Sequence, residues 1–178
     1  MELHTKQLTI DLWPAFEELF GSHGACNGCW CMYWRIGSAY HKRSREFNKQ
    51  EFQNIVQKGP PPGLVAFKDN MAVGWCQLTT KRSLSWLEKN YTYDNTGNED
   101  VWCISCFYIK RGYRRKGVTS ALIKDAIEIV KLSKGKLIEA YPADSASSYT
   151  GYPSTFRKAG FKVVSQGKYK RTIMRLTL

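Results

Sequence analysis

Residues 101–130, VWCISCFYIKRGYRRKGVTSALIKDAIEIV, contain a candidate strand, a basic loop and a candidate helix in direct succession. Residues 101–109 are rich in β-branched and aromatic side chains, which favours a strand. Residues 118–132 place apolar side chains three and four positions apart, as an amphipathic helix does. The loop between them, residues 111–117, is basic and contains two glycines. This succession predicts one α/β unit at the centre of the fold.

The loop and the first turn of the helix form a candidate phosphate-binding site. The first backbone N–H groups of a helix have no intrahelical partner, and the helix dipole is positive there. Gly117 allows the backbone to approach an anion closely, and Thr119 and Ser120 add hydroxyl donors. A diphosphate fits this site, although a solvated basic turn before an ordinary surface helix would show the same residues.

A nucleotide-binding P-loop is a second interpretation of the same residues. Four residues separate Gly112 from Gly117, and Thr119 follows them. Val118, however, occupies the position at which a P-loop has the lysine that reaches the terminal phosphates. Hydrolysis of a nucleoside triphosphate is therefore disfavoured.

The flanking sequence predicts an α/β protein with a mixed sheet and helices on both faces. Two apolar runs joined by Asp69-Asn70 predict a hairpin over residues 64–78. Asp11 and Ser154 are expected to be helix N-caps, because their side chains accept hydrogen bonds from first-turn amides. We expect further strands at residues 7–10, 137–141, 161–164 and 172–176, and further helices at residues 11–20, 46–58 and 154–159.

Length and charge limit the classes of function. The 178 residues suit one domain, and a net charge of +12 implies an anionic partner such as nucleic acid, a membrane surface or a phosphorylated cofactor. No stretch approaches the ~20 consecutive apolar residues of a membrane span. The N-terminus has no apolar signal core, so we expect a cytoplasmic protein.

The six cysteines are expected to be buried free thiols without a metal. Cys26, Cys29 and Cys31 have no obvious fourth ligand for tetrahedral zinc. Cys103 and Cys106 lie at odd spacing within a strand, which predicts side chains on opposite faces of the sheet.

Arg114-x-x-Gly117-x-Thr119 resembles the (Gln/Arg)-x-x-Gly-x-(Gly/Ala) signature of the GNAT superfamily of acetyltransferases, although Thr119 departs from its small last residue. Gly74-Trp75, the strand end at residues 107–109, and the segment FRKAGF at residues 156–161 resemble landmarks of the family in the family's order. The resemblance covers about residues 60–165. The segment GCWCMYWR at residues 28–35 resembles the N-terminal region of an uncharacterised bacterial subgroup.

The resemblance implies a single GNAT-like domain over residues 1–178 that binds acetyl-CoA. Residues 60–165 would form the cofactor-binding core, and residues 1–60 a helical region on the side of the acetyl acceptor. Strand amides would pair with pantetheine and contact the oxyanion, and the loop would hold the pyrophosphate. The implied cofactor-binding residues are Phe107, Ile109, Arg114, Arg115, Lys116, Gly117, Val118, Thr119 and Ser120.

The aromatic residues of the N-terminal segment are either core or the wall of an acceptor site. Aromatic rings supply rigid area and cation–π contact to an amine. Helical spacing between Trp30 and Trp34 predicts one shared face, which suits both interpretations. We favour Trp30, Tyr33 and Trp34 as substrate-binding residues.

The expected acid and base are less well defined. Relatives often carry a glutamate within the strand, whereas this chain has Cys103 and Ser105 there; Glu99, just before the strand, is our candidate base through a water molecule. The position of the family's usual tyrosine is Phe156, which has no proton to donate. A helix that continued backwards would place Tyr152 on the same face, so Tyr152 is our first candidate acid and Tyr149 the second.

The predicted function is acetyl-CoA-dependent N-acetylation of a primary amine in a small molecule or peptide, by a monomer or homodimer that needs no metal and binds no membrane. The missing acid and base would instead suit a GNAT-fold module that binds acyl-CoA without transfer. Binding of nucleic acid rests on charge alone, because no recognition helix or RNA-binding aromatic motif is present, and we expect no specific nucleic-acid partner.

Overall fold

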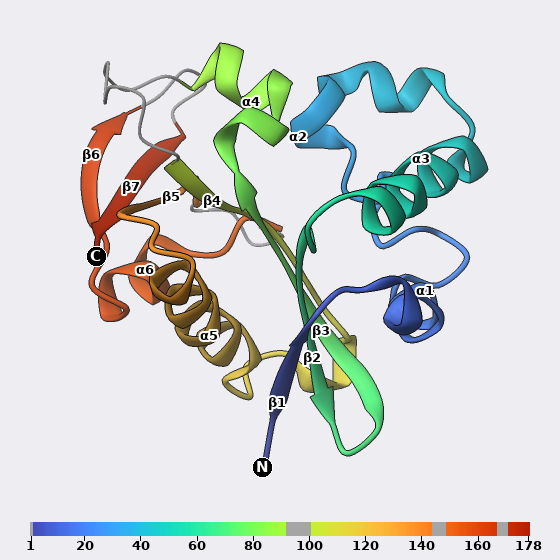
Figure 1. Cartoon of the computed structure of the whole chain (residues 1–178), viewed down its shortest axis with the longest axis horizontal. Coiled ribbons are helices and arrows are strands. Elements are labelled where there is room, and N and C mark those ends of the chain that lie inside the picture. Colours follow the sequence, from blue (N-terminus) through green and yellow to red (C-terminus); the bar gives the residue numbers. More distant parts are fainter. Residues whose placement is uncertain (1, 92–100, 144–148, 167–170) are drawn as a thin grey trace.

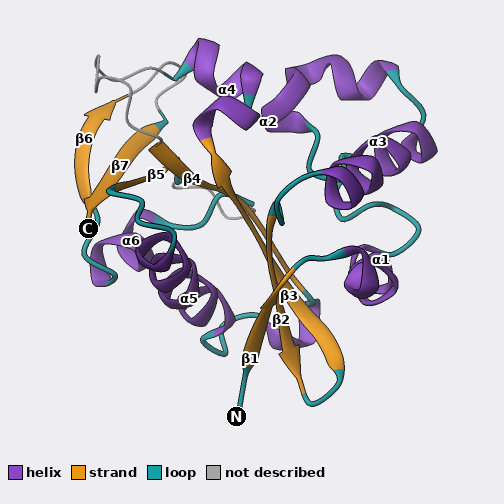
Figure 2. Ribbon diagram, in the orientation of Figure 1, coloured by secondary structure: helices purple, strands orange, loops and turns teal. Residues whose placement is uncertain are grey.

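A seven-stranded mixed sheet forms the centre of the protein (Figures 1 and 2), seen in a computed structural model. The structure describes residues 2–91, 101–143, 149–166 and 171–178. The strand order is β1-β2-β3-β4-β5-β7-β6, and only β4 and β5 pair in parallel. The strands are β1 (His4–Gln7), β2 (Gly63–Lys68), β3 (Met71–Thr80), β4 (Val101–Ile109), β5 (Leu137–Ala140), β6 (Lys162–Gln166) and β7 (Thr172–Thr177).

Helices cover both faces of the sheet, as predicted (Figure 1). One face carries α5 (Val118–Leu132) and α6 (Pro153–Lys158). The other side carries the helices α1 (Trp13–Phe20), α2 (Tyr33–Ile36), α3 (Arg45–Lys58) and α4 (Ser85–Asn90). Short 3-10 helices lie at Ile10–Leu12, Gly37–Lys42, Lys81–Ser83 and Arg111–Tyr113. No helix within the described ranges is both long enough and apolar enough to cross a membrane.

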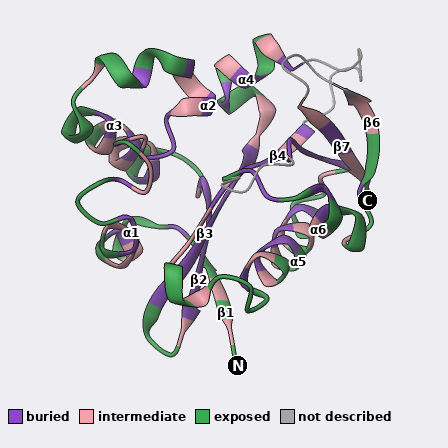
Figure 3. Cartoon of the chain, turned by 180° about the vertical axis from the view of Figure 1, so that it is seen from behind, coloured by how far each residue is buried: buried purple, intermediate pink, exposed green. Residues whose placement is uncertain are grey.

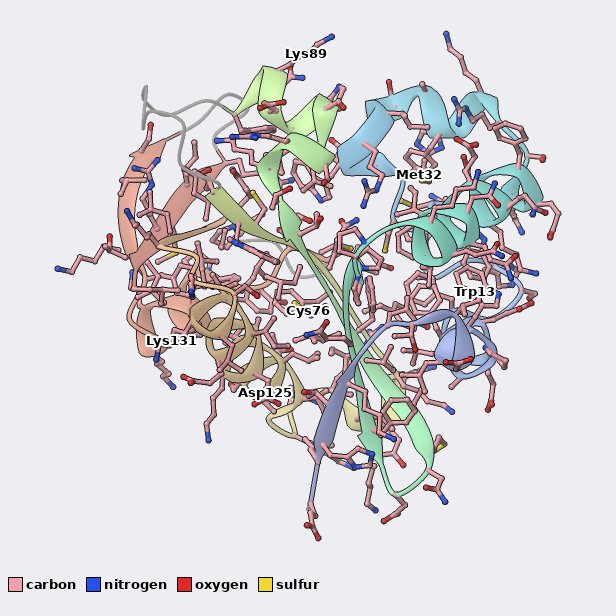
Figure 4. The ribbon with its side chains drawn as sticks, in the orientation of Figure 1. Trp13, Met32, Cys76, Lys89, Asp125 and Lys131 are labelled. Carbon is pink, nitrogen blue, oxygen red and sulfur yellow. The ribbon has the colours of Figure 1, made fainter. Side chains whose placement is uncertain are left out.

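Buried apolar side chains pack on both sides of the sheet, and Figure 3 shows that its central strands are largely buried. The buried side of α5, including Leu122 and Ala126, packs on one face of β3 and β4, where Cys76 is fully buried (Figure 4). The opposite core is aromatic and centres on Trp75 of β3, against which Phe16 of α1 packs edge to face at 4.8 Å between ring centroids. Burial of large rings on both faces explains why the central strands are almost continuously apolar.

Three boundaries differ from the predictions at the ends of elements. The first strand lies at His4–Gln7, not residues 7–10, and Asp11 sits within a 3-10 helix and caps nothing. Ser154 is also not an N-cap, because α6 begins one residue earlier. Proline is favoured at the first helical position, where its missing N–H costs nothing, so Pro153 starts the helix and Tyr152 becomes the cap residue.

A β-bulge at Ser105 changes the faces that β4 presents. Gln77 of β3 pairs with Cys106, but Leu78 pairs with Ile104, so Ser105 is an extra residue in β4. The prediction that Cys103 and Cys106 face opposite sides is therefore wrong. Both thiols lie on the side of the sheet away from α5, because the bulge shifts the alternation by one position.

A buried carboxylate joins β5, β7 and the end of β3. Glu139 is completely buried, accepts hydrogen bonds from Lys81 at 2.7 Å and from Arg175 at 2.6 Å, and accepts a third hydrogen bond from the hydroxyl of Tyr141. Burial alone would raise its pKa, but Lys81, Tyr141 and Arg175 outweigh burial and hold the pKa of the carboxyl below its ordinary value.

Replacement of Glu139 by glutamine should lower the free energy of unfolding by about 3 kcal/mol at neutral pH, because it leaves two buried cations without their counter-charge. The folded pKa is lowered, so the carboxylate stabilises the fold above its unfolded pKa of about 4.3 and this contribution is lost as the pH falls through the folded value. The stability difference between the two proteins should therefore shrink in acid.

Chemical denaturation at several pH values measures both effects. Glu128→Gln is the matched control, since Glu128 pairs with Lys131 at the exposed surface and its loss should cost less than about 1 kcal/mol. Equal destabilisation by the two variants would show that Glu139 has no special role in stability.

Candidate active site

The site lies where β4 and β5 separate. Their parallel pairing ends at Ile104 and Ala140, although β4 continues to Ile109. Two hollows open beyond this point. The loop groove, about 350 Å³, is lined by Phe107, Tyr108, Ile109, Arg114, Arg115, Thr119, Tyr149, Gly151, Tyr152 and Thr155. The aromatic cavity, about 240 Å³, is lined by Phe20, Gly24, Ala25, Cys26, Cys29, Cys31, Tyr33, Trp34, Tyr40, Cys106, Phe107, Tyr108, Ala143, Tyr149, Thr150 and Arg171.

The two hollows share three wall residues, namely Phe107, Tyr108 and Tyr149. A molecule in the loop groove and a molecule in the aromatic cavity would therefore contact the same three residues. The arrangement can bring together the reactive ends of two substrates.

Some backbone amides of β4 point into the gap between β4 and β5. The N–H of Lys110 donates to Val73 of β3 at 3.0 Å, and antiparallel pairing alternates in direction along a strand. The N–H groups of Phe107 and Ile109 consequently point away from β3. That of Phe107 donates to the carbonyl of Tyr149 at 2.6 Å.

The predicted phosphate loop has the geometry of an anion site. Gly117 caps α5 in a left-handed conformation, with φ of 81°, and a Cβ added there would meet no atom within 4 Å. The backbone therefore faces open space at the positive end of a 15-residue helix. Arg114 turns back over the end of β4, with Nε donating to the carbonyl of Ile109 at 3.1 Å.

The structure brings only some of the predicted side chains to this groove. Arg114, Arg115 and Thr119 line it. Val118 packs in the core below α5, so it can offer only its backbone amide. Ser120 lines a different groove, between α5, α6 and β7. Lys116 lies with Nζ 5.7 Å from the centre of the Tyr113 ring.

The two candidate acids occupy different places. Tyr149 lies at the junction of both hollows, whereas Tyr152 lines the loop groove alone. Tyr152 has extended backbone angles as the cap residue of α6, so the expected backward continuation of the helix is absent. Burial, together with a hydrogen bond to Cys26, raises the pKa of Tyr149. Glu99, the candidate base, falls in residues 92–100, outside the described part of the chain.

The aromatic residues of the N-terminal segment divide between core and cavity. Tyr33 and Trp34 line the cavity. Trp30 is instead buried among Trp13 and Phe20, with ring centroids 6.1 and 5.4 Å away. The prediction that Trp30 and Trp34 share a helical face is wrong, because α2 begins only at Tyr33 and the backbone before it has φ of 43° at Trp30.

Four thiols in the cavity wall were not predicted from the sequence. Cys26, Cys29, Cys31 and Cys106 come together there from two distant segments. Burial raises the pKa of Cys29 to about 12 and that of Cys31 well above its ordinary value. Both thiols are therefore neutral and behave as apolar wall. Among the residues that the structure describes, no three His, Cys, Asp or Glu side chains are placed to hold a metal ion.

Arg171 is the one charged residue in the described wall of the aromatic cavity, and no sequence motif marked it. Its Nη1 donates to the carbonyl of Tyr141 at 2.9 Å and to the hydroxyl of Thr150 at 3.0 Å. Its guanidinium lies 5.3 Å from the centre of the Trp34 ring. These contacts fix a cation at the end of an otherwise aromatic and thiol-lined space.

Solved structures share this fold across nearly the whole chain. They include an N-acetyltransferase, PaiA, of Thermoplasma acidophilum in complex with coenzyme A, at 17% identity and a TM-score of 0.55, with all of both chains covered. A polyamine N-acetyltransferase of Drosophila melanogaster is similar at 8% identity and a TM-score of 0.66, with 99% of this chain and 100% of that chain covered. A ribosomal-protein-alanine N-acetyltransferase of Brucella melitensis is similar at 18% identity and a TM-score of 0.58, with 98% and 99% covered.

Sequence comparison gives two further results. No curated protein matches the chain significantly. Residues 27–147, which include the separated strands and the phosphate loop, match the model of the acetyltransferase (GNAT) family. That match spans more than half of the sequence, and the chain belongs to the GNAT acetyltransferase family.

Proposed function

We propose that this protein transfers the acetyl group of acetyl-CoA to a primary amine. The observation that carries the proposal is the junction at Phe107, Tyr108 and Tyr149, where a groove that starts at the loop before α5 meets the half-enclosed aromatic cavity. The diphosphate of the cofactor would bind the amides at the start of α5, beside Arg114 and Arg115. The acceptor amine would enter the aromatic cavity.

The residues at the junction suit the chemistry of the transfer. The neutral amine attacks the thioester carbonyl, a C–N bond forms, and the C–S bond to CoA breaks. The N–H of Phe107 is the candidate donor to the carbonyl oxygen as its negative charge grows, in place of the Tyr149 carbonyl that it now contacts. One proton leaves the amine and one reaches the departing thiolate.

Tyr149 is the better placed of the two candidate acids. Tyr149 lines both hollows, so it would lie near the thioester of a cofactor bound along the groove. A tyrosine hydroxyl is protonated at neutral pH, as a proton donor requires. We therefore propose Tyr149, ahead of Tyr152, as the donor to the thiolate.

A cofactor-binding module without transfer activity is the second candidate function. One observation favours it, since no carboxylate among the described residues lines either hollow, and no other base is evident there. Glu99 is still proposed as a base. One measurement distinguishes the two candidate functions. An acetyltransferase releases free CoA in the presence of an amine, whereas a binding module does not.

Gly117→Asp should weaken binding of acetyl-CoA by more than about tenfold. The new carboxylate would face the diphosphate, and a left-handed backbone costs a non-glycine residue about 1–2 kcal/mol. Gly112→Asp is the matched control, because it makes the same change of charge in open space at a residue outside the groove. Titration calorimetry that gave both variants the affinity of the unaltered protein would remove this loop from the cofactor site.

Tyr149→Phe should lower kcat by about tenfold or more while the affinity for acetyl-CoA stays the same, because only the acidic hydroxyl is lost. Tyr152→Phe is the matching variant and should lower kcat less than Tyr149→Phe does. Steady-state release of CoA thiol measures kcat for both. Full kcat in Tyr149→Phe would mean that the thiolate departs without a proton from this residue.

A further inference from the structure

We propose that the acetyl acceptor is a single amino acid with an apolar or aromatic side chain, and that Arg171 binds its carboxylate. This inference rests on the proposed function, since it assigns the substrate class of the same site. The argument uses the size, the lining and the charge of the aromatic cavity.

The size and lining suit a small apolar molecule. A cavity of about 240 Å³ is small, and it suits a single small molecule such as one amino acid better than a peptide or a polymer. Tyr33, Trp34 and Tyr40 supply aromatic walls, and the thiols of Cys29 and Cys31 are neutral. Such walls favour an apolar side chain over a chain of charged or strongly hydrated groups.

The charge of the cavity excludes polycations and selects an anion. Arg171 provides a positive charge, and the described lining contains no Asp or Glu to offset it. A polyamine would therefore place its distal ammonium groups beside a guanidinium. An acceptor with a carboxylate would instead gain a charge-assisted pair in a half-enclosed, apolar setting.

Arg171 has the donors that such a pair requires. Both hydrogen bonds that Arg171 makes with described residues use Nη1, and a guanidinium carries five N–H groups, so the donors on Nε and Nη2 have no partner among the described residues and can serve a ligand. The described residues give it no carboxylate partner. Lys81 and Arg175 differ from Arg171 in this respect, because both are paired with the carboxylate of Glu139.

The supports of Arg171 also fix its orientation toward a ligand. The Tyr141 carbonyl and the buried Thr150 hydroxyl hold one nitrogen, and the Trp34 ring lies against the guanidinium. The carboxylate end of the acceptor would lie at Arg171, and its amine would lie at the junction with the loop groove. A guanidinium held in this way loses little side-chain entropy when it binds a carboxylate.

A pair of ligands that differ only in the carboxylate tests the inference on the whole protein in the presence of CoA. N-acetyl-L-phenylalanine, the expected product, should bind about tenfold or more tightly than N-acetylphenethylamine in titration calorimetry, as a charged hydrogen bond in a protected site predicts. N-acetyl-L-leucine should bind with comparable strength. Equal affinities for the matched pair, or no binding of either N-acetyl amino acid, would overturn the inference.

Arg171→Met tests the residue and should abolish the preference for the carboxylate without changing the affinity for acetyl-CoA. Arg157→Met removes an arginine on the exposed side of α6, outside both hollows, and should leave the preference intact. If Arg171→Met still preferred the ligand with the carboxylate, another residue would bind the carboxylate and the proposal would be contradicted.

Release of CoA with L-phenylalanine, L-leucine, phenethylamine and spermidine separates this inference from the proposed function. Transfer to phenethylamine or spermidine as efficient as transfer to L-phenylalanine would leave the acetyltransferase assignment standing and overturn the acceptor class. Arg171-dependent binding of the N-acetyl amino acids without transfer to any amine would support the acceptor class and overturn the transfer activity.

Discussion

The early end of the β4–β5 pairing is the constraint on which the rest of the site depends. Beyond Ile104 the two strands no longer share hydrogen bonds, and the β4 amides must find other partners. The Ser105 bulge accompanies this change, and its buried hydroxyl is satisfied by Gln77 at 2.8 Å. A fully paired sheet would leave no gap between β4 and β5 and no junction between the groove and the cavity.

The N-terminal segment makes the cavity because buried polar side chains hold its irregular backbone in place. Gln77 donates to the carbonyl of Cys31 at 3.3 Å, so the bulge and the cavity wall are connected through one amide. Asn48 of α3 donates to the carbonyls of Gly28 and Tyr40, both at 3.0 Å. These bonds supply the partners that a loop without regular secondary structure lacks when it is buried. They explain how a segment with several left-handed residues forms a defined wall.

Positive charge serves different purposes in different parts of the molecule. Lys81 and Arg175 are internal counter-ions of Glu139 and contribute to stability. Arg114 and Arg115 line the groove that begins at the phosphate loop, which suits an anionic cofactor. Arg171 faces an apolar cavity, which suits an anionic acceptor. The net charge of +12 is thus composed in part of cations with local partners, and its magnitude alone identifies none of them.

The sequence by itself determined the order of the main elements, the hairpin, the glycine-bounded loop before α5 and the family, because local periodicity and a glycine before a helix act over a few neighbouring residues. Phe107, Ile109 and Arg114, which the resemblance implied as cofactor-binding residues, line the loop groove, and their role in binding stays a prediction. Only the tertiary structure decided which side chains face the site. The Ser105 bulge moved Cys106 to the cavity side, left-handed turns sent Trp30 to the core, and strand pairing brought Arg171 next to Trp34 from the other end of the chain. Bulges, left-handed turns and long-range strand pairing leave no periodic signal in the sequence, so the lining of the cavity appears only when the chain is folded.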